Sequence, residues 1–148
     1  MSEENIQDLV KKVFVLQEQR VHTYRVFDGH HQEYLKSAPN YDFLKYRQYV
    51  HDVTQEFNRI SLAIIEIQTQ LKNCDKKELV GLIKLLQDEE KSKLELTAAL
   101  QLAKQNAIDH PHDEIGARDI PELKQRLAQT VEKINESLEE MKYELEGS

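Results

Sequence analysis

Apolar side chains recur along the chain at spacings that alternate between three and four residues, which indicates long amphipathic helices. The first series of such positions runs from Ile6 to Tyr34 and includes the polar residues Gln17 and Arg20. Gly29 lies within the series, but the spacing is the same on both sides of it. The pattern predicts a helix over residues 4–36, which Pro39 prevents from continuing.

The second series contains apolar and aromatic residues only. Asn40 or Asp42 is suited to cap the helix that follows, because either side chain can accept a hydrogen bond from a free backbone N–H of the first turn. The pattern predicts a helix over residues 42–72, and we expect it to be the most buried of the molecule. Its inward positions are Phe43, Tyr46, Val50, Val53, Phe57, Ile60, Ile64, Ile67 and Leu71.

Two further helices are predicted over residues 76–106 and 120–146. Asp75 with Glu78, and Asp119 with Glu122, have the spacing of a capping box at a helix start. The segment 107–118 contains Pro and Gly and has no periodicity, so we expect it to be the longest and most mobile connection.

Long helices and short connections predict a single domain over residues 1–148. The chain has only four Gly and three Pro among 148 residues, so few positions interrupt a helix. The best match is an all-α fold, an antiparallel up-down-up-down four-helix bundle with long coiled-coil-like helices.

The charge distribution argues against direct nucleic-acid binding. The formal net charge is −7, and no basic stripe is present that would face a phosphate backbone. Cys74 is the single cysteine, which excludes a disulfide within the chain. Without a signal peptide or a run of about 18 apolar residues, we expect a soluble intracellular protein that does not enter a membrane.

The polar residues within the first and third series predict a polar layer. Gln17 and Arg20 lie about halfway along the first helix, and Glu89, Glu90 and Lys93 lie about halfway along the third. Because alternate helices of this bundle run parallel, the two groups are expected at one level. A layer of ion pairs that fixes the register explains this pattern best, and a ligand pocket in the bundle centre is the alternative.

The turn around Pro39 is flanked by eight of the ten aromatic residues, between positions 24 and 57. Most of these rings are expected to close the end of the bundle. Aromatic and basic residues are also enriched in protein interfaces, so the same corner is a candidate partner site; stacking of single-stranded bases is a further alternative. The candidate partner residues are Tyr41, Lys45, Arg47, Tyr49 and His51. The acidic face of the fourth helix is an alternative surface for a basic partner.

No motif of the sequence indicates catalysis. A paired-metal site in a bundle needs Glu-x-x-His, which does not occur, and the nearest matches are Asp28 with His31 and Asp109 with His112. A glycine-rich phosphate loop and a nucleophile elbow are also missing from the sequence. We therefore expect no enzyme activity, no cofactor and no metal site.

The residues around the turn resemble those of a known family. Tyr34-Leu35, Pro39, Tyr41-Asp42-Phe43, Tyr46-Arg47, Val50-His51, Val53-Thr54 and Phe57 are similar to the motif of the required-for-excision B-domain family, small eukaryotic helical proteins associated with DNA excision repair. The resemblance extends from about Leu9 to Leu145 and supplies no catalytic residues. It implies a nuclear accessory or scaffold protein of DNA repair.

These observations together predict a non-enzymatic scaffold or adaptor that supports DNA excision repair through protein–protein contacts. A coiled-coil-like subunit of a cytoplasmic cytoskeletal or trafficking complex is the alternative, since its composition would be similar. The sequence identifies neither the protein partner nor the oligomeric state, and a homo-oligomer is compatible with it. A nuclear location is implied by the resemblance alone.

Overall fold

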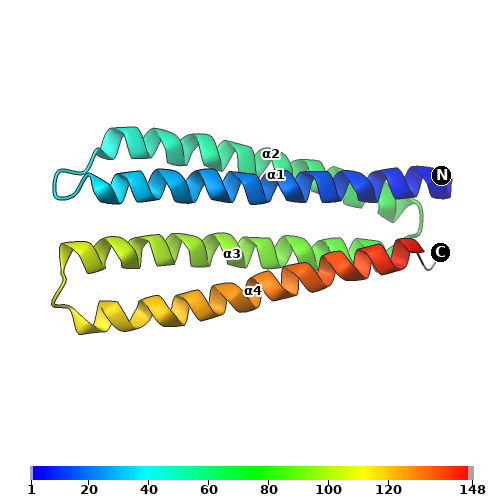
Figure 1. Ribbon diagram of the computed structural model, residues 1–148. Helices are drawn as coiled ribbons and strands as arrows, with labels where there is room; N and C mark the ends of the chain where they lie inside the picture. Colours follow the sequence, from blue (N-terminus) through cyan, green and yellow to red (C-terminus); the bar gives the residue numbers. More distant parts are fainter. Residues whose placement is uncertain (1, 147–148) are drawn as a thin grey trace.

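The structure is a computed structural model that describes residues 2–146, and it consists of four long helices. They are α1 (Glu3–Lys36), α2 (Phe43–Asn73), α3 (Lys77–Asp109) and α4 (Glu114–Glu146). Successive helices run in opposite directions and form an elongated rod, with both ends of the chain at the same end of the rod (Figure 1). The predicted all-α four-helix bundle is confirmed.

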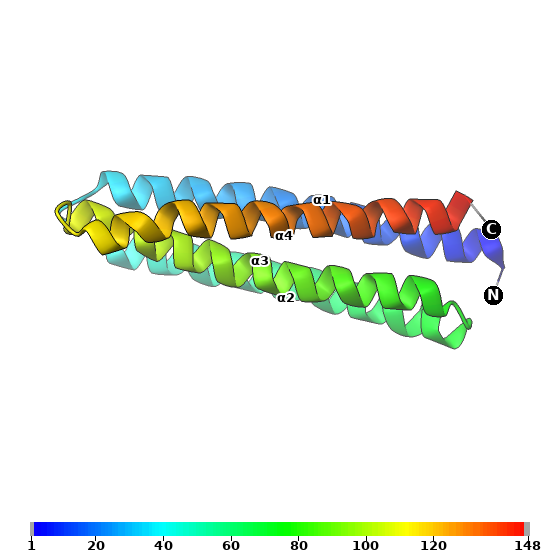
Figure 2. The ribbon, with the colours of Figure 1, turned by 90° about the horizontal axis from the view of Figure 1, so that it is seen from below.

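The bundle is built from two helical hairpins. α1 packs along α2 and α3 packs along α4, whereas contacts between the hairpins are fewer and involve mainly α2 with α3. Both views show α1 and α3 running in the same direction along the rod (Figures 1 and 2). This parallel arrangement places the middle of α1 level with the middle of α3.

Two apolar clusters of different size form the core. The larger one fills the end of the rod that holds the chain termini, and it includes the fully buried Val10, Ile64 and Ile83. The smaller one lies toward the α1–α2 turn and consists of Phe27, Val53 and Phe57, with Tyr24, Tyr46 and Val50 packed against it. The core is therefore much more extensive at one end than at the other.

The expectation that α2 is the most buried helix is wrong. α1 buries ten side chains and α2 buries six, and the predicted core residue Phe43 is 61% exposed. Within the described residues, α1 contacts each of the other three helices, whereas α2 contacts only α1 and α3. The completely apolar series of α2 therefore did not indicate how many other helices this helix contacts, and that number decides how much of it is buried.

The predicted capping box at Asp75 is also wrong. Asp75 has a φ of 60° and follows the end of α2 rather than opening α3. Its N–H donates to Lys72 O (3.3 Å), and the N–H of Lys76 donates to Leu71 O (3.2 Å). This pair of bonds is a Schellman motif, which satisfies the last carbonyls of α2, and Asp tolerates the left-handed conformation that the motif requires.

The start of α4 differs from the prediction by six residues. α3 continues to Asp109 and α4 begins at Glu114, so most of the predicted loop over residues 107–118 is helical. Asp113 Oδ1 accepts a hydrogen bond from the N–H of Gly116 (3.4 Å), which is the capping role expected of Asp119. Pro121 consequently lies inside the helix, where it removes one backbone hydrogen bond.

Candidate functional site

The polar residues of α1 and α3 meet in the middle of the bundle. Gln17 Nε2 donates to Glu90 Oε1 (2.7 Å), and Arg20 Nη1 donates to Gln17 Oε1 (3.1 Å). Arg20 Nε lies 3.9 Å from Glu90 Oε2, which is too long for a hydrogen bond and leaves a Coulombic contact between two buried charges. Among the described residues, Glu90 Oε2 has no hydrogen-bond donor.

Two partners of Arg20 were missed by sequence reasoning. Arg20 Nη2 donates to Gln87 Oε1 (2.6 Å) and to Ser61 Oγ (3.0 Å), so that α2 also takes part in the layer. Gln87 lies one turn before Glu90 on the same face of α3. This spacing could have predicted that Gln87 belongs to the layer. Ser61 had no such signal, because its position opposite Arg20 depends on the packing of the first hairpin.

The other two predicted members of the layer behave differently. The ammonium of Lys93 lies 4.0 Å from the centre of the Tyr24 ring, a cation–π contact beside the layer. Glu89 is half-buried, and within residues 2–146 no hydrogen bond or ion pair connects it to Gln17 or Arg20. The structure thus joins three of the five predicted residues directly, with Lys93 adjacent to them.

Burial dominates the electrostatics of this layer. It lowers the pKa of Arg20, although the nearby Glu90 carboxylate opposes this shift. Burial also lowers the pKa of Lys93 and raises the pKa of Tyr24. The charged groups of the layer are therefore paired and enclosed, as expected of a layer that specifies which residues of α1 face α3.

Three tyrosines close the end of the rod near Pro39. Tyr34 stacks on Tyr41 and on Tyr46, with ring centres 4.8 Å and 4.3 Å apart. Each hydroxyl hydrogen-bonds to a side chain of α3: Tyr46 donates to Gln101 (3.0 Å), Gln105 donates to Tyr34 (3.3 Å), and Tyr41 donates to Asp109 (2.6 Å). Because the α3 residues are four apart, they lie on one face of the helix and bind the three rings in order. We call this set the tyrosine corner.

The tyrosine corner includes one of the predicted partner residues. The hydrogen bond to Asp109 raises the pKa of Tyr41 to about 12, and burial raises the pKa of Tyr46 to about 12. Both hydroxyls therefore stay protonated near neutral pH and remain donors. Tyr41 connects the α1–α2 turn to the end of α3.

The other four predicted partner residues lie on two flanks of α2. Tyr49 stacks on His30 of α1, with ring centres 3.5 Å apart, and the Lys45 ammonium is 5.8 Å from the centre of the Tyr49 ring. Arg47 and His51 are exposed and project from the opposite flank. The structure therefore does not bring the five residues together as one site.

Two apolar residues at the start of α2 are exposed, which their spacing in the sequence did not predict. Phe43 is 61% exposed and Leu44 is 79% exposed, at the first turn of α2. Phe43 was assigned to the core on its spacing, and Leu44 was not assigned at all. Phe43 and Leu44 precede Arg47 by four and three positions, and His51 follows it by four, so these exposed residues share one side of α2. We call them the α2 tip: Phe43, Leu44, Arg47 and His51.

The part of the chain that the structure describes contains neither a metal-binding cluster nor a membrane-spanning helix. Within residues 2–146, no group of three or more His, Cys, Asp and Glu side chains is spaced to hold a metal ion. In the same part of the chain, none of the helices combines the length and apolar character that a membrane span requires.

The fold and the polar layer define an elongated four-helix bundle that is closed by a tyrosine corner. The DNA repair REX1-B family matches residues 8–104, and this chain belongs to that family. A Required for excision 1-B domain-containing protein of Bos taurus is 30% identical over 144 residues, which cover 97% of this chain and 78% of the bovine protein. The protein of the same description from Mus musculus is 29% identical over 144 residues, 97% of this chain and 83% of the mouse protein. Family membership connects this chain with DNA repair.

Proposed function

We propose that this protein is a non-enzymatic adaptor that supports DNA excision repair by binding a protein partner. Membership in the DNA repair REX1-B family supports the repair role. The observation that carries the adaptor role is the α2 tip, where Phe43 and Leu44 are largely exposed beside Arg47.

The α2 tip has the composition of a protein interface, and its side chains are exposed. An exposed aromatic ring beside arginine is the combination that contributes most to binding energy when a partner excludes water from it. The neighbouring tyrosine corner holds the start of α2 against α3 through Tyr41, so the tip is presented on a fixed helix end. A partner would therefore meet a surface that is already ordered before binding.

A deletion strain tests the repair role. Cells that lack this protein should remove ultraviolet-induced pyrimidine dimers more slowly than wild-type cells, which an antibody against the dimers measures over several hours. Normal dimer removal in the deletion strain would contradict the repair role. Cleavage of irradiated plasmid by the purified protein would contradict the non-enzymatic mechanism.

Complementation tests the α2 tip itself. The variant Phe43→Ala/Leu44→Ala/Arg47→Ala should fold but fail to restore dimer removal. The matched control is Leu62→Ala/Ile65→Ala, which removes apolar side chains that are 66% and 47% exposed elsewhere on α2. The control should restore removal, with equal protein levels on immunoblots. Restoration by the tip variant would contradict this site.

A further inference from the structure

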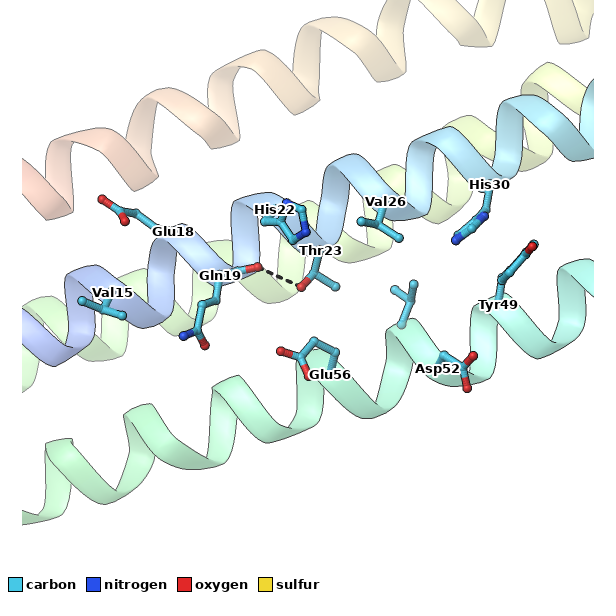
Figure 3. A pocket seen from close by; sticks show the side chains of 11 residues that line it. Val15, Glu18, Gln19, His22, Thr23, Val26, His30, Tyr49, Asp52 and Glu56 are labelled. Atoms are coloured by element: carbon cyan, nitrogen blue, oxygen red, sulfur yellow. Dashed lines mark hydrogen bonds between the residues drawn. The ribbon is translucent and has the colours of Figure 1, made fainter.

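A groove runs between α1 and α2 on the outside of the bundle. Its volume is about 730 Å³, and only residues of α1 and α2 line it. Val15, Val26 and Val53 supply apolar surface within it, and Val15 and Val26 are 53% and 38% exposed. Figure 3 shows the His30 and Tyr49 rings facing each other at its right-hand end.

The rim of this groove is acidic on both sides. Glu18 lies on the α1 side, Asp52 and Glu56 lie on the α2 side, and no lysine or arginine is among the lining residues. Arg59 forms an ion pair with Glu56 (2.5 Å) and compensates that charge. Within residues 2–146, no cation pairs with Glu18 or Asp52, so two carboxylates at the rim are left without a counter-charge.

We propose that this groove binds a basic amphipathic α-helix of a partner protein. Its apolar side chains would cover Val15 and Val26, and its flanking Lys and Arg side chains would face Glu18 and Asp52. A helix laid in a groove between two helices is a recurring mode of recognition, with anchors at every third or fourth position. From Val15 to His30 the groove extends roughly 22 Å at 1.5 Å per residue, which a helix of about 15–18 residues matches.

The charge of the rim discriminates among occupants. A nucleic acid would bring phosphates against Glu18 and Asp52, which is unfavourable. A second copy of this chain carries a net charge of −7, and its exposed α4 face presents further glutamates. A basic helix is the occupant whose charge is complementary, and complementarity of this kind sets specificity and association rate.

Binding of a synthetic helix tests the groove. The probe is a labelled amphipathic peptide of about 18 residues with Leu at every third or fourth position and Lys and Arg on both flanks. Its matched control has Glu in place of the basic residues. By fluorescence anisotropy, the basic peptide should bind the full chain at least about tenfold more tightly than the acidic one. Equal affinity for the two, or no binding of either, would overturn the proposal.

Matched variants assign the binding to this groove. Glu18→Lys/Asp52→Lys should weaken binding of the basic peptide at least about tenfold, whereas Glu132→Lys/Glu136→Lys on the exposed face of α4 should leave it unchanged. The reverse pattern would show binding to α4 and overturn the proposal. All four positions are exposed, so both double variants should fold, and circular dichroism checks this.

A photo-cross-linker identifies the natural occupant. Benzoylphenylalanine in place of Val26 should cross-link, in living cells, to a segment with basic amphipathic helical character, which mass spectrometry of the linked peptides reads directly. Cross-links only to a second copy of this chain, or to an acidic segment, would overturn the proposal.

The groove proposal rests on the proposed function in one respect, because both require that this protein binds a protein partner. Failure of the groove proposal and failure of the repair role give different experimental results. If the deletion strain removes dimers slowly but the basic peptide does not bind the full chain, the groove proposal is overturned and the repair role stands. If the deletion strain removes dimers normally while the peptide results hold, the repair role is contradicted and the groove proposal stands.

Discussion

Arg20 connects three of the four helices through one side chain. Its guanidinium contacts Gln17 on α1, Ser61 on α2, and Gln87 and Glu90 on α3. Taking the arginine and Glu90 out of water is costly, and their mutual attraction offsets that cost only while both are present. We therefore expect the layer to contribute to the register of the bundle more than to its stability.

Replacement of Arg20 alone should be strongly destabilising. Arg20→Leu removes the guanidinium that pairs with the buried Glu90 carboxylate, which should lower the free energy of unfolding by about 3–5 kcal/mol in urea denaturation. The double variant Arg20→Leu/Glu90→Leu should recover more than half of this loss. An unchanged denaturation midpoint for the single variant would show that the pair is not significant for stability. Arg59→Leu, at an exposed pair, is the control.

His31 should make the stability depend on pH. Burial and the nearby Lys104 lower its pKa, while Asp28 opposes the shift, and the ring packs near Tyr34 and Tyr46. The unfolded chain then binds a proton more readily than the folded one. The stabilisation is present above the unfolded pKa of about 6.5 and is lost as pH falls through the folded pKa, at most about 1.4 kcal/mol per pH unit.

Denaturation curves between pH 5 and pH 8 measure this effect. His31→Gln should reduce the dependence of stability on pH, and His22→Gln, at an exposed position, should leave it unchanged. A wild-type chain whose stability rises as pH falls from 7 to 5 would contradict the sign of the shift.

The two ends of α4 differ in how firmly they are held. From Glu114 to Gln129, no described side chain is buried, whereas Ile134 and Met141 in the second half are buried in the large cluster. Pro121 lies in the weakly packed half and provides no N–H for the carbonyl of Ala117. The first half of this helix therefore depends on its own backbone hydrogen bonds.

Removal of this proline should strengthen α4. Pro121→Ala restores one backbone donor and should raise stability by about 1–3 kcal/mol. Hydrogen exchange should show slower exchange of the amides of residues 114–125 in the variant. Lys124→Ala, at an exposed position nearby, should change neither quantity by a comparable amount. Unchanged protection in Pro121→Ala would indicate that these turns open independently of position 121.

At the scale of the whole molecule, the polar layer separates a large core from a small one. The large cluster contains thirteen buried residues and the small one contains three, on either side of Gln17 and Arg20. The end near the tyrosine corner is held to a greater extent by side-chain hydrogen bonds between tyrosines and α3. Because local stability follows the number of buried apolar contacts, the two ends should open separately.

Native-state hydrogen exchange tests this difference. Amides around Val10, Ile64 and Ile83 should exchange more slowly than those around Phe27 and Val53. Ile64→Ala should lower the free energy of unfolding by about 2–5 kcal/mol and accelerate exchange throughout the rod. Uniform exchange rates along α1 and α2 in the wild-type chain would contradict the two-part core.

The sequence by itself determined the features that depend on helical periodicity. The apolar positions from Ile6 to Tyr34 lie inward as their spacing indicates, and Asp42 caps α2. Gln17, Arg20 and Glu90 could be placed at one level because the rise per residue converts sequence position into height along a helix.

Only the tertiary structure decided which side chains meet across helices. The tyrosine corner joins residues that are 55 to 71 positions apart, and the spacing of Gln101, Gln105 and Asp109 becomes meaningful only when the three rings stand opposite them. The exposure of Phe43, the helical start of α4 and the groove beside Val26 likewise depend on where neighbouring helices end. Periodicity specifies the face of a helix, whereas the number and position of its neighbours are set by the packing of the two hairpins.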